Sequence, residues 1–396
     1  MKKIFLSRAK GQIARNYTIR DINKQIVLNY VRARSPISRA DIARETSLQR
    51  STVSAIVEDL QKAGMIEESG TGDSNGGKKP MLLRLKAGTP VAIGVDVTPR
   101  HTTVAIADLT GHILRQEQFP TSSDIDYMNE QILSKVGKLV EEYPEADLAV
   151  GISIPGIADQ DSGGILYIPY FQWVNWDIGN QISQKFNLPV TIDNDANAVA
   201  LAELWFGSDE IKKTRNFIVV LVAEGIGTGI IIDGQIYRGE SGAAGEFGHM
   251  FVGENAPVKC SCGRRDCWEA HASEKAIIQR YASRNGSAAG AVTIDHIIGL
   301  AKNGEKHAVN VLKETAHYLG IGISNLIIGF SPQTIVISGK IVHAWDLISD
   351  EISMLSLRSI RHELSGANIV PSELGDNPTT VGSISLVLSR KFVSAN

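Results

Sequence analysis

The strongest constraint on the fold is a series of strand-like runs separated by helical stretches, beginning after Gly88-Thr89-Pro90. These runs are rich in β-branched residues and cover residues 91–97, 102–108, 148–154, 190–193 and 217–222. Strands that alternate with helices predict an α/β fold. The first two runs form a β-turn-β unit with Asp96 near the end of its first strand, and a similar glycine-rich pair lies near Gly225. We therefore expect a duplicated architecture with a cleft between two lobes.

The first 88 residues follow a helical pattern instead. Apolar residues at 22, 26, 27 and 31 have helical spacing, and Ser35-Pro36 ends this helix. A second helix opens at Ser38, whose hydroxyl caps it, with Asp41 in the capping-box position that usually holds Glu or Gln. A third helix is expected from about Gln49 through Ala63, with a polar, basic first turn. This arrangement is typical of a helix-turn-helix, whose recognition helix presents its first residues to base edges.

Two strand-like runs, 65–68 and 81–85, flank a glycine- and lysine-rich loop and predict a wing, so residues 1–88 are interpreted as a winged helix-turn-helix domain. This segment contains 17 Lys and Arg against 8 Asp and Glu, a net charge of +9, whereas the remainder has 23 against 35, or −12. A basic module on an acidic body favours a polyanion as the partner of the first part only, and the helix-turn-helix indicates that this polyanion is double-stranded DNA. The alternative is a solvated basic surface.

Several polar side chains of this module are candidates for DNA contact. Those expected to reach bases or nearby phosphates are Arg50, Ser51, Thr52 and Ser54. Those expected to reach the DNA backbone are Arg39, Lys78 and Lys79. The basic arm before the first helix, with Lys2, Lys3, Arg8, Lys10 and Arg15, either reaches a groove or is disordered.

The three cysteines Cys260, Cys262 and Cys267 all lie in one short stretch, just downstream of His249. Three thiolates and an imidazole form a tetrahedral set that suits Zn²⁺, and a closed four-ligand site is structural rather than catalytic. The alternative is three buried apolar thiols, which have no reason to share this spacing. Reduced thiols, the lack of a signal-peptide core and the lack of an apolar run of ~20 residues favour a cytoplasmic protein.

Five motifs of the body stand in the order found in the ROK family of repressors and sugar kinases. They are Ile154-Pro155-Gly156, residues 193–198, residues 225–230, residues 245–249, and the cysteine stretch running to Cys267-Trp268-Glu269. The resemblance covers essentially the whole body and, with the winged helix in front, implies a ROK transcriptional repressor. It implies a two-lobed, actin/hexokinase-like and ribonuclease-H-like body. One departure is Asp266, where the family usually has Gly.

The expected domain boundaries follow from these assignments. The winged helix-turn-helix covers residues 1–88, the first α/β lobe covers 89–200 with completion by 380–396, and the second lobe with the zinc site covers 201–379. We expect a homodimer or homotetramer that places winged helices on a pseudo-palindromic operator and responds to a small sugar.

The resemblance also implies a sugar site made of Asn194, Asp195, Glu246, His249 and Glu269. A sugar offers hydroxyls that donate and accept, so carboxylates, amides and imidazoles suit its pocket. Asp195 stands where the family's kinases keep the base that deprotonates the attacking hydroxyl.

The two phosphate loops differ from those of the family's kinases. Asp96-Val97-Thr98-Pro99-Arg100 replaces a Gly-Gly-Thr that follows the aspartate, and Ala223-Glu224-Gly225-Ile226-Gly227 replaces Gly-Thr-Gly-Ile-Gly. Proline removes a backbone donor, arginine adds bulk, and a carboxylate opposes a triphosphate. We therefore predict that the chain is not an enzyme. The alternatives are a ROK sugar kinase with a DNA-binding appendage and a repressor controlled by a partner protein.

Residues 167–176 contain five aromatic residues in a chain that is only 6% aromatic. Aromatic faces stack on the apolar faces of sugar rings, so the stretch is interpreted as a platform beside the pocket, as part of the core, or as a dimer contact.

Overall fold

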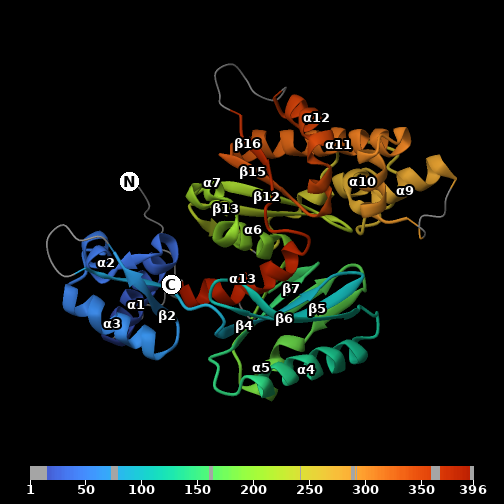
Figure 1. The fold of residues 1–396 in the computed structure, drawn as a ribbon. Coiled ribbons are helices and arrows are strands. Elements are labelled where there is room, and N and C mark those ends of the chain that lie inside the picture. The colour runs from blue at the N-terminus through green and yellow to red at the C-terminus, as the bar shows by residue number, and fades with distance from the viewer. Residues whose placement is uncertain are drawn as a thin grey trace, which may run out of the picture. The chain divides into compact units, whose positions relative to one another are not determined.

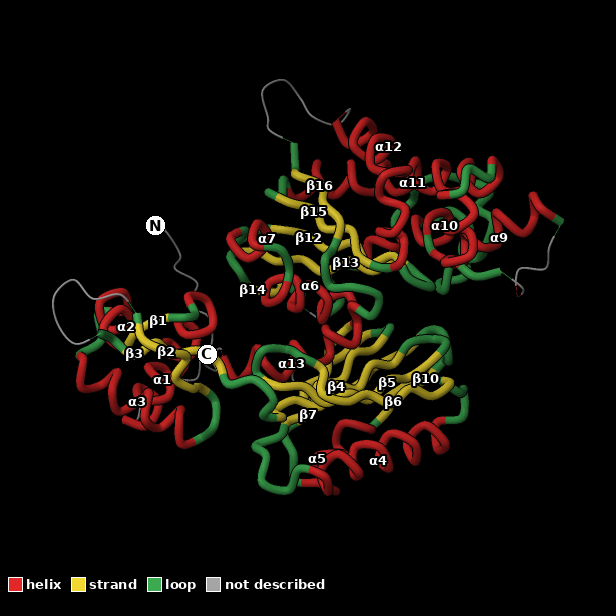
Figure 2. Tube along the Cα trace, viewed as in Figure 1, coloured by secondary structure: helices red, strands yellow, loops and turns green. Residues whose placement is uncertain are grey.

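The computed structural model describes residues 16–72, 79–159, 164–240, 242–286, 290, 292–357 and 366–392. The contacts within the chain divide it into two compact units. One comprises Met1–Thr89, Asp108–His112 and Leu388–Asn396, and the other comprises Pro90–Ala107 and Ile113–Val387. The expected α/β fold with a helix-turn-helix in front is confirmed (Figures 1 and 2).

Up to Thr89, the described residues of the N-terminal unit form three helices and a three-stranded sheet in the order β1-β3-β2. Its elements are α1 (Asn16–Arg34), β1 (Ile37–Ser38), α2 (Arg39–Thr46), α3 (Arg50–Lys62), β2 (Ile66–Thr71) and β3 (Met81–Leu85). The Ser38 hydroxyl accepts a hydrogen bond from the Asp41 backbone N–H at 3.2 Å, as the capping pattern predicts. The apolar stripes of the helices, including Val31, Ile42 and Val57, are buried.

Two expectations for this unit need correction. The first helix ends at Arg34, directly before Ser35-Pro36 as expected, but it begins at Asn16, well before Ile22, because its first turns carry no apolar period. The two-residue strand β1, which pairs Ile37 with Leu83, was not expected, since a strand this short leaves no alternation to read.

The first sheet of the larger unit has the order β11-β7-β4-β5-β6. Its strands are β4 (Pro90–Val97), β5 (His101–Asp108), β6 (Ile113–Pro120), β7 (Ala149–Ile154) and β11 (Val190–Asn194). Helices α4 (Ile125–Glu142) and α5 (Ile178–Phe186) lie on one face, and the first part of α13 (Pro378–Phe392) lies on the other (Figure 1). The lack of a side chain at Gly94 and Gly151 permits this approach, because a Cβ at Gly151 would lie 2.0 Å from the Ser383 carbonyl oxygen.

The second sheet has the order β14-β13-β12-β15-β16, with the hairpin and the parallel strands in the same places as in the first. Its strands are β12 (Phe217–Val222), β13 (Ile226–Ile232), β14 (Gln235–Ile236), β15 (Thr334–Ser338) and β16 (Asn368–Pro371). The repeated order confirms the expected duplication. The hairpin turns that follow β4 and β12 are the equivalent loops of the two lobes.

Helices cover both faces of the second sheet (Figure 2). Helices α6 (Asp195–Phe206) and α7 (Asp209–Lys213) lie on one side, and the other side carries α8 (Trp268–Ala272), α9 (Glu274–Asn285), α10 (Ile294–Lys302), α11 (Lys306–Phe330) and α12 (Trp345–Leu357). Two 3₁₀ helices lie within the described residues, η1 (Glu246–His249) and η3 (Lys340–Ala344). A small separate sheet contains β8 (Ile157–Ala158), β9 (Ile165–Ile168) and β10 (Trp173–Trp176). Among the helices that the structure describes, none is long and apolar enough to cross a membrane.

Tight packing of α8 against α11 positions the site. Trp268 is fully buried, and a Cβ at Gly322 would lie 2.1 Å from its indole Cε2. The indole therefore fixes the short helix that follows Cys267 and begins with Trp268 and Glu269.

Candidate functional site

A cavity of about 480 Å³ opens between the two lobes. Its lining includes all five side chains that the sequence assigned to a sugar site: Asn194, Asp195, Glu246, His249 and Glu269. The structure thus brings together residues from β11, α6, η1 and α8. Their role in binding sugar stays a prediction.

Asn194 and Asp195 are presented by the junction of β11 and α6. Asn194 caps the helix: its Oδ1 accepts from the backbone N–H groups of Ala196 at 2.9 Å and Asn197 at 3.3 Å, and its Nδ2 donates to the Gly156 carbonyl at 3.1 Å. These bonds fix the strand-to-helix turn that points Asp195 into the cavity.

The Asp195 carboxyl has an unusual environment. Burial raises its pKa to about 7, and the carboxylates of Asp96, Glu246 and Glu224 add to the rise, although the Ala196 N–H opposes it. Burial also raises the pKa of Glu246, which His249 opposes. At neutral pH Asp195 is therefore able to accept or to donate a hydrogen bond to a hydroxyl group.

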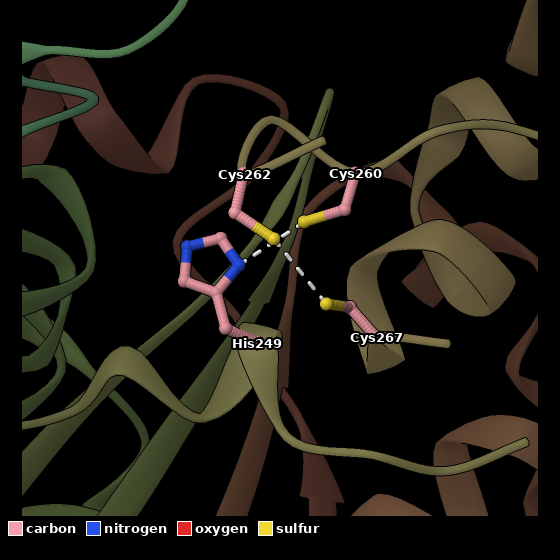
Figure 3. A group of neighbouring side chains, drawn as sticks. All are labelled: His249, Cys260, Cys262 and Cys267. Carbon is pink, nitrogen blue, oxygen red and sulfur yellow. Dashed lines mark hydrogen bonds between the residues drawn. The ribbon is translucent and has the colours of Figure 1, made fainter. Parts of the chain in front are cut away.

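The metal-ligand cluster predicted from the sequence is present (Figure 3). The ligand atoms of His249, Cys260, Cys262 and Cys267 all lie within 4.8 Å of one another. His249 Nδ1 lies 3.1 Å from Cys260 Sγ, and Cys262 Sγ lies 3.5 Å from Cys267 Sγ. Cys262 is exposed, which argues against the alternative of three buried apolar thiols. A Cys3His set converging on one point fits the tetrahedral preference of Zn²⁺.

A tight loop holds the cysteines in place. The Cys260 N–H donates to the Arg264 carbonyl at 2.9 Å and the Gly263 N–H donates to the Cys260 carbonyl at 2.9 Å. Gly263 has a φ of 90°, which favours glycine. Asp266 is not among the described residues with positive φ, so the replacement of the family's usual glycine leaves the loop's turn intact.

His249 and Glu269 each face both the cluster and the cavity. The second ring nitrogen of His249, Nε2, lies 3.5 Å from Glu246 Oε2. Glu269 is buried and accepts from the Ser261 N–H at 2.8 Å and from the Cys260 thiol at 3.2 Å. His249 therefore belongs to both the cluster and the cavity wall, and Glu269 of the cavity wall contacts the cluster through Cys260.

The aromatic stretch divides between two roles. Tyr167 and Tyr170 line the cavity. Trp173 and Trp176 are buried, and their indole N–H groups donate to the Ser123 carbonyl at 3.0 Å and to Asn129 Oδ1 at 2.7 Å. The two tryptophans thus belong to the core, and only the tyrosines are placed to meet a ligand.

The two loops that the sequence analysis compared with kinase phosphate loops both reach the cavity. Pro99 and Glu224 line it, and Arg100 Nε lies 3.0 Å from Glu224 Oε1. Asp96 Oδ2 accepts from the hydroxyls of Thr379 at 2.7 Å and Thr380 at 2.8 Å. Sequence reasoning missed both threonines, since they start a helix almost at the other end of the chain.

In the N-terminal unit, the four residues proposed to read DNA lie in the first turns of α3. Arg50 and Ser51 are exposed, and Thr52 and Ser54 are partly exposed. Lys79 is exposed as well. Arg39 is partly engaged within the unit, because its guanidinium donates to Gln61 Oε1 at 3.1 Å and lies 4.0 Å from Glu68.

Lys78 and the residues of the basic arm, Lys2, Lys3, Arg8, Lys10 and Arg15, lie outside the described residues.

A duplicated two-lobed body with this cavity, joined to a winged helix, defines a class of protein. Residues 92–390 match the ROK family and residues 26–73 match the MarR family. The chain belongs to the ROK family.

Two curated relatives match over nearly the full length. The chain is 33% identical to the xylose repressor of Bacillus subtilis strain 168, over 95% of this chain and 97% of that protein. It is 29% identical to the DNA-binding transcriptional dual regulator NagC of Escherichia coli K12, over 96% of this chain and 95% of that protein.

Solved structures show the same relationships. A ROK family transcriptional regulator, described as a homologue of the Escherichia coli MLC protein, has a TM-score of 0.77 at 26% identity and covers 95% of this chain and 97% of its own. A ROK family glucokinase from Streptomyces griseus, solved with glucose and AMPPNP, has a TM-score of 0.67 at 27% identity and covers 75% of this chain and 98% of its own.

Proposed function

We propose that the chain is a transcriptional repressor of carbohydrate-utilisation genes. Its affinity for operator DNA is controlled by a small sugar, xylose or a related one. The observation that carries this proposal is the combination, in one chain, of a basic winged helix with a cavity lined by convergent carboxylates, an amide and an imidazole. The full-length relatives named as a xylose repressor and as NagC support it.

The sugar acts by shifting an equilibrium between DNA-competent and DNA-incompetent arrangements. To relieve repression it must bind the incompetent arrangement more tightly, since equal affinity for both shifts nothing. Operator DNA then weakens sugar affinity by the same factor. Titration of the sugar with and without operator DNA tests this, and equal affinities in the two titrations contradict it.

The sugar is held but not phosphorylated. The Arg100–Glu224 pair stands where the related kinases have glycine-rich phosphate loops, so bulk and a carboxylate replace the backbone donors that a triphosphate needs. Asp195 would then hold a hydroxyl instead of activating it. Phosphoryl transfer from ATP to any sugar by the purified protein would establish the alternative, a ROK sugar kinase.

A structural zinc ion fits the four-residue cluster. His249, Cys260, Cys262 and Cys267 would hold it, and its charge would fix the histidine and the cysteine loop, which Glu269 contacts. No step of binding passes through the metal, because all four of its positions are taken by protein ligands.

We further propose a cytoplasmic homodimer or homotetramer in which two winged helices occupy the half-sites of a pseudo-palindromic operator. The domains would be residues 1–88, 89–200 completed by 380–396, and 201–379. Gel-shift titration against operator half-sites and full sites measures whether binding is paired.

Control by a partner protein is the remaining alternative. Sugar-dependent thermal stabilisation separates the two, because a ligand at a hundred times its Kd adds roughly 2.7 kcal/mol to the free energy of unfolding. A screen of mono- and disaccharides by thermal shift, repeated in the gel-shift assay, tests the proposal, and Arg50→Ala serves as the variant with intact sugar response and weakened DNA binding.

A further inference from the structure

Two separate segments of the chain supply most of the proposed sugar contacts. The junction of β11 and α6 presents Asn194 and Asp195, and η1 presents Glu246 and His249. Both segments bring a carboxylate to the same cavity: burial raises the pKa of Asp195 to about 7, and the nearby Glu246 carboxylate adds to the rise. Because these two like charges repel, their positions depend on contacts that hold the two segments together.

An ion pair between Asp193 and Arg238 is one such contact. Asp193 directly precedes Asn194 on β11, and Arg238 lies on the loop that runs from β14 to η1. The Arg238 guanidinium donates to Asp193 Oδ2 from Nε at 3.0 Å and from Nη2 at 2.6 Å. Neither residue is among the described residues that line the cavity. The pair therefore joins the two segments without itself being placed to touch a sugar.

The Asp193 carboxylate is fully engaged. Its side chain is 3% exposed, and that of Arg238 is 31% exposed. The second oxygen, Oδ1, accepts from the Asn194 backbone N–H at 2.8 Å and from Asn197 Nδ2 at 3.1 Å. The same carboxylate thus holds the strand-to-helix turn on one side and the guanidinium on the other. Charge-assisted bonds from a rigid, planar group restrict both distance and orientation, which a flexible ammonium group does not.

The loop after Arg238 depends on its anchored ends. Gly239, Gly242 and Gly245 all have positive φ, at 71°, 75° and 95°, and glycine moves easily among such conformations. The Arg238 carbonyl accepts from the Ala244 N–H at 3.0 Å, which closes the loop. At the far end, the Thr228 hydroxyl donates to the Gly245 carbonyl at 2.5 Å and ties the start of η1 to β13. The side chain of Arg238 is the link from this loop to the segment that carries Asp195.

We propose that Arg238 is a positioning residue for the sugar site. Through Asp193 it sets the separation between the segment with Asn194 and Asp195 and the segment with Glu246 and His249, and so determines whether these side chains reach one sugar ring together. The inference rests on the proposed sugar site and adds a residue outside the cavity on which sugar affinity depends.

Calorimetry of xylose, glucose and N-acetylglucosamine binding to the full-length, zinc-loaded protein is the first test. In Arg238→Ala we expect affinity for whichever sugar the parent binds to fall at least about ten-fold, because converging groups lose affinity when they are displaced slightly. Zinc content and operator affinity without sugar are expected to be unchanged. The matched control is Arg284→Ala, which breaks a part-exposed ion pair with Glu314 in the same lobe, where neither partner is among the described residues lining the cavity.

Chemical rescue separates positioning from general loosening of the structure. Methylguanidinium chloride can occupy the part-exposed space left by the Arg238 side chain, and we expect it to restore most of the sugar affinity of Arg238→Ala. Methylammonium chloride at the same concentration matches the charge and the ionic strength but has no planar set of N–H groups, so it should restore little.

A second variant guards against misfolding, because Arg238→Ala leaves a buried carboxylate without its cation. The double variant Asp193→Asn/Arg238→Gln removes both charges, and the asparagine oxygen is still able to accept from the Asn194 N–H. We expect the same loss of sugar affinity in this variant, with zinc content again unchanged.

The outcomes separate the positioning role from the proposed function. If the parent binds sugar and both variants bind it as tightly, the positioning role is overturned and the sugar-responsive repressor stands. A loss that methylguanidinium does not reverse, or that Arg284→Ala shares, also overturns the positioning role. If the parent binds none of the sugars and none alters operator binding, both the sugar site and the positioning role fail.

Discussion

Arg100 Nε and Glu224 Oε1 lie 3.0 Å apart, and this ion pair joins the β4–β5 turn of one lobe to the β12–β13 turn of the other. The Arg100 side chain is 50% exposed, so the pair adds well under about 1 kcal/mol to stability. Its consequence is local. It places a guanidinium and a carboxylate beside the cavity, at the two turns that carry them.

We expect that removal of the Arg100–Glu224 ion pair increases the affinity of the chain for ATP. Arg100→Gly combined with Glu224→Thr takes away bulk and negative charge, and we expect ATP affinity to rise at least ten-fold, measured by calorimetry. Arg115→Gly, which breaks an exposed ion pair with Glu142 on the same lobe, is the matched control. An ATP affinity that stays unmeasurable in the double variant would show that other features exclude the nucleotide.

The stability of the protein depends on pH through Asp96. This carboxyl is 2% exposed, and burial raises its pKa to about 6, although the Thr379 and Thr380 hydroxyls oppose the shift. In the unfolded chain the pKa of this carboxyl is near 4. Burial of the charged carboxylate therefore leaves the free energy of unfolding unchanged below about pH 4, lowers it progressively as the pH rises, and has its full destabilising effect above about pH 6.

The variant Asp96→Asn removes this cost, because the amide oxygen still accepts from the threonines. We expect the variant to be more stable than the parent by ~3 kcal/mol at pH 8, from about two pKa units at 1.36 kcal/mol each, with no difference near pH 4. Urea titrations at the two pH values measure it. A gain that is equal at both pH values would assign the effect to packing instead of charge.

Those parts of the site that depend on local spacing could be predicted from the sequence. The cysteine cluster, the Asn194-Asp195 junction and the Ser38 cap each depend on residues that are only a few positions apart in the sequence. By contrast, the bond between Thr379 and Asp96 spans 283 positions, and it exists only because α13 packs across the first sheet. A small cavity whose lining includes Lys259 of the cysteine loop and Lys275 of α9 could not be predicted either, because it exists only when both elements are in place.

Loss of the metal is expected to remove the sugar response. In Cys260→Ala or Cys262→Ala, His249 loses its fixed orientation and the loop around Glu269 loosens, so zinc content and sugar affinity fall together. Metal analysis and calorimetry on the same sample measure both. Asp266→Gly restores the family's usual residue without touching a ligand and should keep both. A zinc-free variant with normal sugar affinity would reduce the cluster to a fold-stabilising element.

Substitutions in the winged helix are expected to separate sequence reading from phosphate contact. Arg50→Ala at the start of α3 should weaken operator binding by about 1–3 kcal/mol and relax preference among operator sequences. Lys79→Ala should weaken binding uniformly and lower the salt slope by about one. Arg39→Ala should have the smaller effect, because Gln61 already holds its guanidinium. Gel-shift titrations at several salt concentrations distinguish these patterns, and a uniform loss for Arg50→Ala would contradict its role in reading bases.

Substitution of Gly225 directly tests whether the Glu269 carboxylate in the cavity wall contacts the sugar. A Cβ at this position would lie 2.4 Å from Glu269 Oε2 and 2.9 Å from Tyr170 Oη, so Gly225→Ala must displace the carboxylate from its place on the wall. Its φ is not positive, so the backbone tolerates alanine. We expect sugar affinity to fall at least ten-fold while operator affinity in the absence of sugar is unchanged. Gly299→Ala in α10, where a Cβ meets nothing within 4 Å, is the control. Normal sugar affinity in Gly225→Ala would remove Glu269 from the proposed contacts.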